Sequence, residues 1–138
     1  MNVTYLLDTN TLNYIAKGRS PAARARLQSL GESDAACISS ITEAEVRYGL
    51  AKRPQAHALR QAIEGLLFKF RILPWGSGEA LAYGNLRAKL EAAGTILSEL
   101  DLLIAAHAIA VGAVLVTNDK ALARIKDLHG TVNWATDI

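Results

Sequence analysis

Short apolar runs alternate along the chain with longer segments in which apolar residues recur every three or four positions. The short runs have the length of strands buried on both faces, and the longer segments are typical of amphipathic helices. The pattern predicts strands at 3–7, 35–39, 70–75, 113–117 and 131–134, and helices at 11–17, 21–30, 42–52, 59–70, 78–93, 100–111 and 120–126. Strands that alternate with helices are joined by right-handed crossovers, so we expect an α/β fold, a single parallel sheet of about five strands with helices on both faces.

Glycine and proline mark several of the predicted helix ends. Gly18 follows the first helix in the left-handed position that glycine occupies most readily, and Gly94 and Gly112 end two later helices. Pro21 suits the first turn of a helix, whereas Pro54 cannot continue one. These signals agree with the boundaries that the hydrophobic pattern predicts.

The length and composition fit one globular domain. The chain has 138 residues, of which 51% are hydrophobic, and we expect residues 1–138 to form a single domain with a substantial core. The single cysteine, Cys37, lies in an apolar run, which suits a buried thiol in a reducing compartment. Because the sequence has no signal-peptide pattern and no apolar run long enough for a membrane span, we expect a cytoplasmic protein. The net charge of +2 permits a polyanionic partner without requiring one.

The first predicted strand ends in Asp8, directly before Thr9 and Asn10. Ligands of an open parallel sheet bind beyond the carboxyl ends of its strands, so an aspartate at the end of a central strand is a candidate for chemistry. The alternative is structural, because Asp, Thr and Asn are all favoured caps for the helix that follows. Asp8 alone does not decide between these two interpretations.

Three other acids stand in comparable places. Glu45 lies in the first turn of the helix after the second strand, Asp101 opens the helix before the fourth strand, and Asp119 follows that strand. A helix that leads into a parallel strand runs antiparallel to it, so the start of the Asp101 helix should lie at the same sheet edge as the other acids. We therefore expect one pocket to be rimmed by Asp8, Glu45, Asp101 and Asp119.

Each of these acids also has a structural explanation. Thr42 with Glu45 and Ser98 with Asp101 match or approach a capping box, and Asp119 is a good cap for the next helix. Capping does not explain why four acids converge, because two unit charges about 5 Å apart repel by roughly 3 kcal/mol at an effective dielectric near 20. A divalent cation relieves this repulsion, and ligation by oxygen alone favours magnesium or manganese over zinc.

Two functions are compatible with such a site. In phosphodiester hydrolysis, the metal stabilises charge on the phosphate and activates a water molecule, and a carboxylate outside the ligand set takes the proton of that water. The alternative is a non-catalytic binding module, in which the acids hold a structural cation or a basic segment of a partner.

Four stretches of the sequence resemble a known family. They are Leu6–Asn10, Ile41–Gly49, Leu100–Ala108 and Val116–Asp119, and they occur in order over nearly the whole chain. They look like the signature blocks of PIN-domain ribonucleases, specifically the virulence-associated protein C (VapC) toxins of bacterial toxin–antitoxin pairs. The resemblance implies a PIN-like fold and a magnesium- or manganese-dependent endoribonuclease with the catalytic acids Asp8, Glu45, Asp101 and Asp119. In this interpretation Asp8 and Asp101 hold the metal most directly, and Thr117 and Asn10 support the acids.

The same resemblance implies the partners of the protein. They are an RNA substrate, a cognate antitoxin that inserts an Arg or Lys among the acids, and a second copy of the chain. The apolar stripe of Leu59, Ile63 and Leu66 on one helix suggests that part of this surface is buried in a two-fold homodimer. We expect no association with a membrane.

Two polar residues near the signature stretches are predicted to lie outside the site. Glu43 stands two residues before Glu45, about 200° around a helix, and should point away from the pocket. His107 lies six residues after Asp101, about 120° from it around the helix, and we interpret it as structural.

Overall fold

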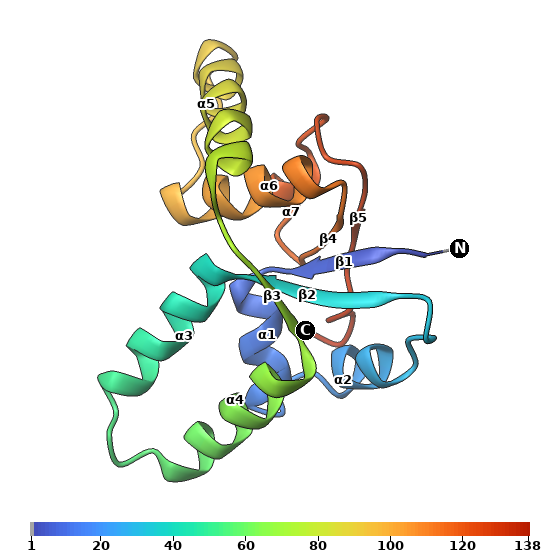
Figure 1. Cartoon of the computed structure of the whole chain (residues 1–138), viewed down its shortest axis with the longest axis vertical. Coiled ribbons are helices and arrows are strands. Elements are labelled where there is room, and N and C mark those ends of the chain that lie inside the picture. Colours follow the sequence, from blue (N-terminus) through green and yellow to red (C-terminus); the bar gives the residue numbers. More distant parts are fainter. Residues whose placement is uncertain (1) are drawn as a thin grey trace.

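The chain alternates between strands and helices, as the hydrophobic pattern predicts (Figure 1). The structure is a computed structural model and describes residues 2–138. The strands are β1 (Thr4–Leu7), β2 (Ala35–Ser39), β3 (Arg71–Leu73), β4 (Val114–Val116) and β5 (Thr131–Val132). The helices are α1 (Thr9–Ala16), α2 (Pro21–Gln28), α3 (Ser40–Ala51), α4 (His57–Lys69), α5 (Ser77–Ala92), α6 (Glu99–Val111) and α7 (Lys120–Ala123). Each predicted strand and helix is present, with boundaries that differ by a few residues.

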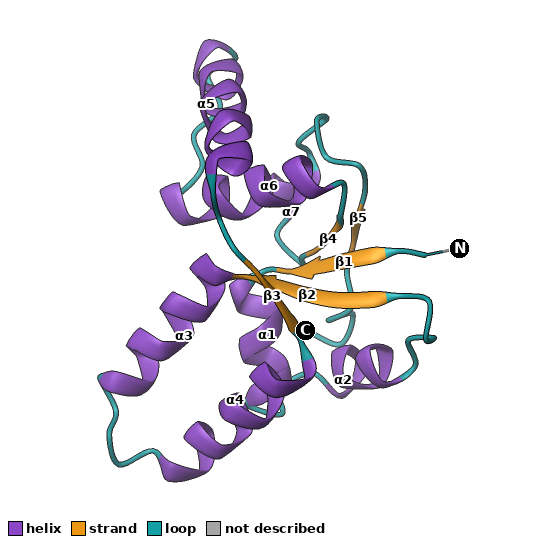
Figure 2. Ribbon diagram, in the orientation of Figure 1, coloured by secondary structure: helices purple, strands orange, loops and turns teal. Residues whose placement is uncertain are grey.

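The strands form one parallel sheet in the order β3-β2-β1-β4-β5 (Figure 2). The N-terminal strand β1 is central, and its Leu6 lies opposite Cys37 of β2 and Leu115 of β4. Parallel alignment brings the carboxyl ends of these three strands to one edge of the sheet, where α1, α3 and α7 begin. Residues that follow β1 and β4 are therefore neighbours in space although they are far apart in the sequence.

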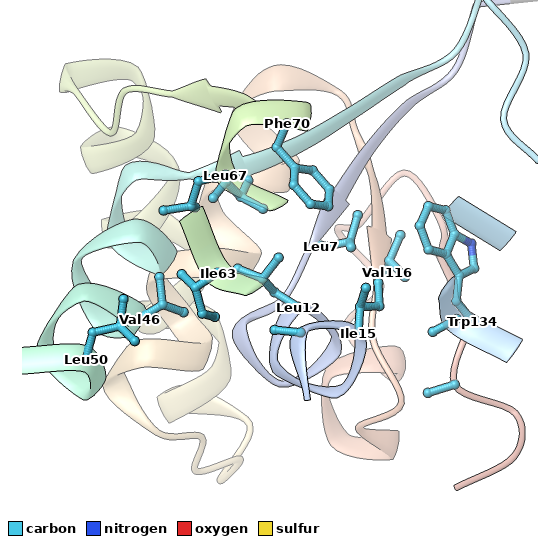
Figure 3. Packing of buried hydrophobic residues seen from close by; sticks show 14 residues of the cluster. Leu7, Leu12, Ile15, Val46, Leu50, Ile63, Leu67, Phe70, Val116 and Trp134 are labelled. Carbon is cyan, nitrogen blue, oxygen red and sulfur yellow. The ribbon is translucent and has the colours of Figure 1, made fainter. Parts of the chain in front are cut away.

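Alternation along the strands divides the core between the two faces of the sheet. Leu6, Cys37 and Leu115 pack with side chains of α5, α6 and α7 on one face. Leu7 and Val116 pack on the other face, against α1 to α4. Figure 3 shows this second cluster, which also includes Leu12, Ile15, Val46, Leu50, Ile63, Leu67, Phe70 and Trp134. Within residues 2–138, no helix has both the length and the apolar character of a membrane-spanning segment.

Serine side chains start the two helices that carry Glu45 and Asp101. Ser39, the last residue of β2, accepts a hydrogen bond from the backbone N–H of Ile41 at 3.1 Å and so begins α3 directly after the strand. Ser98 begins α6 in the same way, through the backbone N–H of Asp101 at 3.1 Å. Caps of this kind typically stabilise a helix by about 1 kcal/mol. They fix where the first turn of each helix lies relative to the sheet edge.

The edge strand β3 is shorter than the predicted segment 70–75. Phe70 is the C-cap of α4 and is buried in the core, so it belongs to the helix end rather than to the strand. Pro74 lacks the N–H that the sheet ladder needs, which ends β3 at Leu73. The helix ends are closer to the prediction, and Gly18 and Gly112 have φ angles of 67° and 69°.

The apolar stripe on α4 packs inside the chain. Ile63 and Leu67 are buried in the core, and Leu59 and Leu66 pack against it. The stripe thus packs mainly within the chain, where α4 lies against α1 and α3, and the homodimer stays a prediction. The large apolar side chain that α4 exposes is Phe68, at 94%.

Candidate active site

Asp8 lies at the carboxyl end of the central strand, and only 5% of it is exposed. Its Oδ1 accepts a hydrogen bond from the backbone N–H of Thr11 at 2.8 Å, so Asp8 caps α1. Its own backbone N–H donates to the carbonyl oxygen of Val116 on β4 at 3.0 Å. The aspartate is thus held between two strands and a helix, and its capping role leaves it at the sheet edge where ligands bind.

The pKa of the Asp8 carboxyl is raised above its ordinary value. The largest cause is burial, because a charged carboxylate loses its hydration there. Hydrogen bonds from Thr117 and Thr11 favour the charged form and lower the pKa in part. The negative charge of Asp101 raises it further. For its charge to act on Asp8, Asp101 must lie nearby, as expected from the position of α6.

Asp101 stands in the first turn of α6 and is half-buried. Its backbone N–H is used by the Ser98 cap, so the helix start does not depend on the carboxylate of Asp101. In the part of the chain that the structure describes, that carboxylate has no hydrogen-bond or ion-pair partner. It is therefore available to a ligand.

Asp119 caps α7 and is connected to Asp8 through a threonine. Its Oδ1 accepts hydrogen bonds from the backbone N–H groups of Ala121 at 2.8 Å and Leu122 at 3.2 Å. Its own N–H donates to the hydroxyl of Thr117 at 3.0 Å. Thr117 also lies close enough to Asp8 to lower the pKa of its carboxyl, so this threonine stands between the aspartates that follow β1 and β4.

Glu45 is exposed on α3, where it lines a cavity together with Asn13 and Lys17 of the α1 segment. Glu43 lies elsewhere on α3, as predicted, and forms an ion pair with Arg47 at 3.4 Å. Arg47 also contacts a glutamate of α4, so this ion pair belongs to the packing of the two helices.

The predicted acids are therefore not equivalent. The charge of Asp101 acts on Asp8, and Thr117 lies between Asp8 and Asp119. Glu45 lies on the wall of a separate cavity. Within residues 2–138, no three His, Cys, Asp or Glu side chains are grouped closely enough to hold a metal ion between them. That all four acids act in one site stays a prediction.

Besides Thr117, the structure brings the hydroxyls of Thr9, Thr11 and Thr42 to the region of Asp8, which the sequence did not reveal. Thr11 is 1% exposed, and its hydroxyl donates to the carbonyl oxygen of Val116 at 3.4 Å. The hydroxyls of Thr9 and Thr42 lie 3.2 Å apart and join the starts of α1 and α3. The available signal was the position of Thr11, three residues after a strand-terminal aspartate, where the N–H partner of a cap is found.

Two further polar residues make no hydrogen bond with the acids in the described part of the chain. His107 is fully buried, and its Nδ1 lies 2.8 Å from the hydroxyl of Ser39, so it supports the cap of α3 as a structural residue. Burial lowers the pKa of His107 and favours the neutral ring. Asn10, predicted to support the acids, is exposed.

Comparison with known proteins places this arrangement of elements and acids in a family. Residues 5–128 match the PIN domain, a span that includes every signature acid. The chain belongs to the PIN-domain family. It is 36% identical to ribonuclease VapC2 of Rickettsia felis over 131 residues, which cover 94% of this chain and 97% of that protein. It is 33% identical to the tRNA(fMet)-specific endonuclease VapC of Salmonella typhimurium over 115 residues, or 83% of this chain and 86% of that protein.

The fold of this PIN domain is also close to those of solved structures. The VapBC2 structure from Rickettsia felis, bound to a DNA fragment from the promoter, aligns with a TM-score of 0.88 and 34% identity over 96% of this chain and 99% of the matched chain. DNA-bound VapBC from Salmonella typhimurium aligns with a TM-score of 0.86 and 32% identity over 96% and 98%. The PIN domain is thus of the VapC type, as the four signature stretches predict.

The paired acids of this PIN domain suit a hard divalent cation. Magnesium is usually bound through one or two carboxylates, with water and substrate phosphates completing its shell, so Asp8 and Asp101 offer a sufficient donor set. The softer donors are occupied elsewhere, since Cys37 is buried in the core and His107 is bonded to Ser39. A cation beside the pair would stabilise the charged form of Asp8, which burial disfavours most and the charge of Asp101 disfavours further.

Proposed function

We propose that this PIN domain is a metal-dependent endoribonuclease that acts in the cytoplasm as the toxin of a toxin–antitoxin pair. The observation that carries the proposal is the buried carboxylate of Asp8 at the carboxyl end of the central strand, with Asp101 near enough for its charge to act on it. Ligand sites of parallel sheets lie at this edge, and buried like charges are costly without a cation. The names of the relatives, ribonuclease VapC2 and tRNA(fMet)-specific endonuclease VapC, support the same activity.

Asp8 and Asp101 would hold magnesium or manganese. The bound ion stabilises charge on the phosphate and lowers the pKa of a water molecule. The chain itself holds Asp8 in place, through the backbone N–H of Thr11 and the hydroxyl of Thr117, so that little reorganisation is needed when the substrate arrives.

Asp8 and Asp101 are proposed to hold the ion, so Glu45 and Asp119 are the candidates for the general base. Asp119 uses Oδ1 to cap α7, which leaves its second carboxylate oxygen for a proton. In hydrolysis, the water oxygen attacks the phosphorus atom, the bond from phosphorus to the leaving oxygen breaks, and one of these carboxylates takes the proton of the water. The other carboxylate of the two would help to balance charge at the pocket.

Cleavage of RNA by the purified protein, with and without a chelator, tests the proposal. We expect cleavage in magnesium or manganese, no cleavage in excess EDTA, and recovery when the metal is restored. A non-catalytic binding module would bind the cation or a basic partner without cutting RNA under any of these conditions. Equal cleavage with and without the chelator would contradict the metal requirement.

A cognate antitoxin is the partner that this function requires. A solved toxin–antitoxin complex from Klebsiella pneumoniae aligns with this chain at a TM-score of 0.68 and 28% identity. We propose that a disordered tail of the antitoxin orders along the toxin and inserts an Arg or Lys among the acids, because a guanidinium fork can engage two carboxylate oxygens. The inserted charge would compete with the metal for Asp8 and Asp101.

Replacement of that basic residue tests the mechanism of inhibition. We expect an antitoxin with Ala at this position to inhibit RNA cleavage less and to leave more metal bound. If inhibition and metal occupancy were unchanged, the antitoxin would have to act by blocking RNA elsewhere. A small gene for a DNA-binding protein directly upstream would support the pairing independently.

A two-fold homodimer is a separate proposal. Exposed apolar side chains remain at the α5 end of the molecule, which projects away from the sheet (Figure 1). Leu81 on α5 is 69% exposed, and Ile96 in the loop that follows is 93% exposed. We expect sedimentation to give a dimer at micromolar concentration, whereas a monomer with no loss of activity on dilution would contradict it.

A further inference from the structure

A groove between α1, α3 and α4 starts at Glu45 and is lined by basic residues. Its cavity, of about 130 Å³, is bounded by Lys17 after α1 and by Lys52 and Arg53 after α3. A second cavity, of about 420 Å³, shares Lys17 and Arg53 with the first and adds Arg19. We call this combined surface the basic groove and define it by Lys17, Arg19, Lys52 and Arg53.

The cations of the basic groove are not neutralised by the protein. Lys17, Lys52 and Arg53 are exposed, and within residues 2–138 no carboxylate oxygen lies within 4.0 Å of their charged nitrogens. Glu45 is the one acid among the residues that line the two cavities in the described part of the chain. Cations also favour helix C-termini for electrostatic reasons, but that explanation does not require them to share one cavity.

The basic groove runs away from the candidate active site. The hydroxyl contact of Thr9 with Thr42 joins the starts of α1 and α3 beside Asp8. From there Glu45 is one turn along α3, and Lys52 is a further seven residues on, about 10 Å at the rise of an α-helix. A polymer that leaves the site along this groove therefore passes Glu45 first and the cations next.

An exposed aromatic ring stands at the same place. Tyr48 of α3 is 59% exposed, and the Nζ of Lys52 lies 4.5 Å from the centroid of its ring. Cations beside an exposed aromatic ring are the combination with which proteins bind single-stranded nucleic acid, through backbone phosphates and base stacking. An acidic peptide would use the cations but would gain little from the ring.

We propose that the basic groove binds the phosphates of single-stranded RNA next to the scissile bond, with Tyr48 as a stacking surface for a base. This inference rests on the proposed ribonuclease function and names the residues that position its substrate. Lys17, Lys52 and Arg53 are positioning residues, because they hold the backbone and do not touch the reacting atoms.

The test measures binding without cleavage. The full chain with Asp8→Asn binds a short fluorescein-labelled single-stranded RNA, followed by anisotropy at several salt concentrations. Adding Lys17→Ala, Lys52→Ala and Arg53→Ala should weaken binding at least about tenfold at low salt and reduce the slope of log affinity against log salt by about 2, since each lost phosphate contact removes about 0.7.

The matched control is Lys69→Ala, Arg71→Ala and Lys126→Ala, which removes the same charge from exposed residues outside the groove. Equal losses in the two triple variants would mean a general charge effect and would overturn the proposal.

Tyr48 provides a second measurement. Tyr48→Leu should weaken RNA binding several-fold without changing the salt slope, and Tyr48→Phe should restore it, because stacking needs the ring and not the hydroxyl. An unchanged RNA affinity in both the groove triple variant and Tyr48→Leu, with weaker antitoxin binding, would assign the groove to an acidic protein segment and overturn the RNA proposal. Failure of the wild-type chain to cleave RNA would instead count against the proposed function, which the binding assay does not measure.

Discussion

Asp8 has two roles that oppose each other in the metal-free protein. As a cap it stabilises α1, but as a buried carboxylate beside Asp101 it carries a charge that folding disfavours. We expect Asp8→Asn to lower kcat/KM for RNA by at least about 100-fold. The same variant should leave the metal-free unfolding free energy unchanged or raise it by up to about 1 kcal/mol, because Asn caps as well as Asp and carries no charge.

Urea unfolding in EDTA measures this stability change. Asp119→Asn is the control, because Asp119 is less buried than Asp8 and also keeps a capping side chain after the replacement. If Asp8→Asn lost more than about 1 kcal/mol while Asp119→Asn did not, Asp8 would be mainly a structural residue.

Thr117 is the residue whose hydroxyl serves two acids at once. Thr117→Val keeps the shape of the side chain but removes the hydroxyl that accepts a hydrogen bond from the N–H of Asp119 and that lowers the pKa of Asp8. We expect a loss of about 1–2 kcal/mol in unfolding free energy and weaker magnesium binding, measured by denaturation and calorimetry. Thr117→Ser should retain both properties. Equal behaviour of the valine and serine variants would show that the hydroxyl is unimportant.

His107 gives the fold a pH dependence of known sign. Burial holds its pKa below the ordinary value near 6.5, so the folded state accepts a proton less readily than the unfolded chain. Its contribution to stability is present above about pH 6.5 and is lost as the pH falls below that value towards the folded pKa. We expect the unfolding free energy to decrease from pH 7 to pH 5, and the decrease to be smaller in His107→Gln. His57→Gln, at an exposed position, should keep the wild-type slope. Identical slopes in all three proteins would contradict this role.

At the scale of elements, α4 uses its apolar face for its own core. Ile63 is 2% exposed, whereas Phe68 on the same helix is 94% exposed. We expect Ile63→Ala to cost about 2–4 kcal/mol, because the cavity stays inside a packed cluster, and Phe68→Ala to cost little. Chemical denaturation of the two variants measures the difference. If Ile63→Ala changed the unfolding free energy little, and the change grew with protein concentration, the stripe would instead belong to a dimer interface.

The elements could be predicted from the sequence because the apolar runs are bounded by clear signals. β2 was predicted to the residue, and the helix that carries Asp101 within one residue at its start. Phe70 was assigned to a strand because an aromatic next to Ile72 and Leu73 resembles one, but tertiary packing makes it the end of α4. The sequence of an apolar stripe likewise does not show whether the stripe packs against its own chain or against a second copy.

The acids of the site were predicted from their places at strand and helix ends, and their grouping around one pocket stays a prediction. Alternation and capping place Asp8, Asp101 and Asp119 at one edge of the sheet. They do not say that Glu45 faces a cavity, since that depends on how α3 tilts against α1. The basic groove was invisible for the same reason, because its cations are scattered along the sequence and only folding assembles them.

At the scale of the whole molecule, metal binding should be visible as stability. A cation that binds the folded state alone raises the unfolding free energy by about 1.4 kcal/mol when its concentration is tenfold above Kd. We therefore expect magnesium to raise the melting temperature of the wild type and not that of Asp101→Asn. Sodium chloride at matched ionic strength controls for screening. A similar rise in the variant would place the cation elsewhere.

The central position of β1 determines how much of the chain must be translated before the candidate site can form. Asp8 leaves the ribosome early, but its neighbour β4 and its partner Asp101 are synthesised near the end. Domains form as their segments emerge from the N-terminus onward. A truncated translation product that stops before α6 therefore carries half of an aspartate pair and an unfilled place in its sheet. The proposed site can therefore form only when translation of the chain has passed β4, even though its first aspartate is among the first residues made.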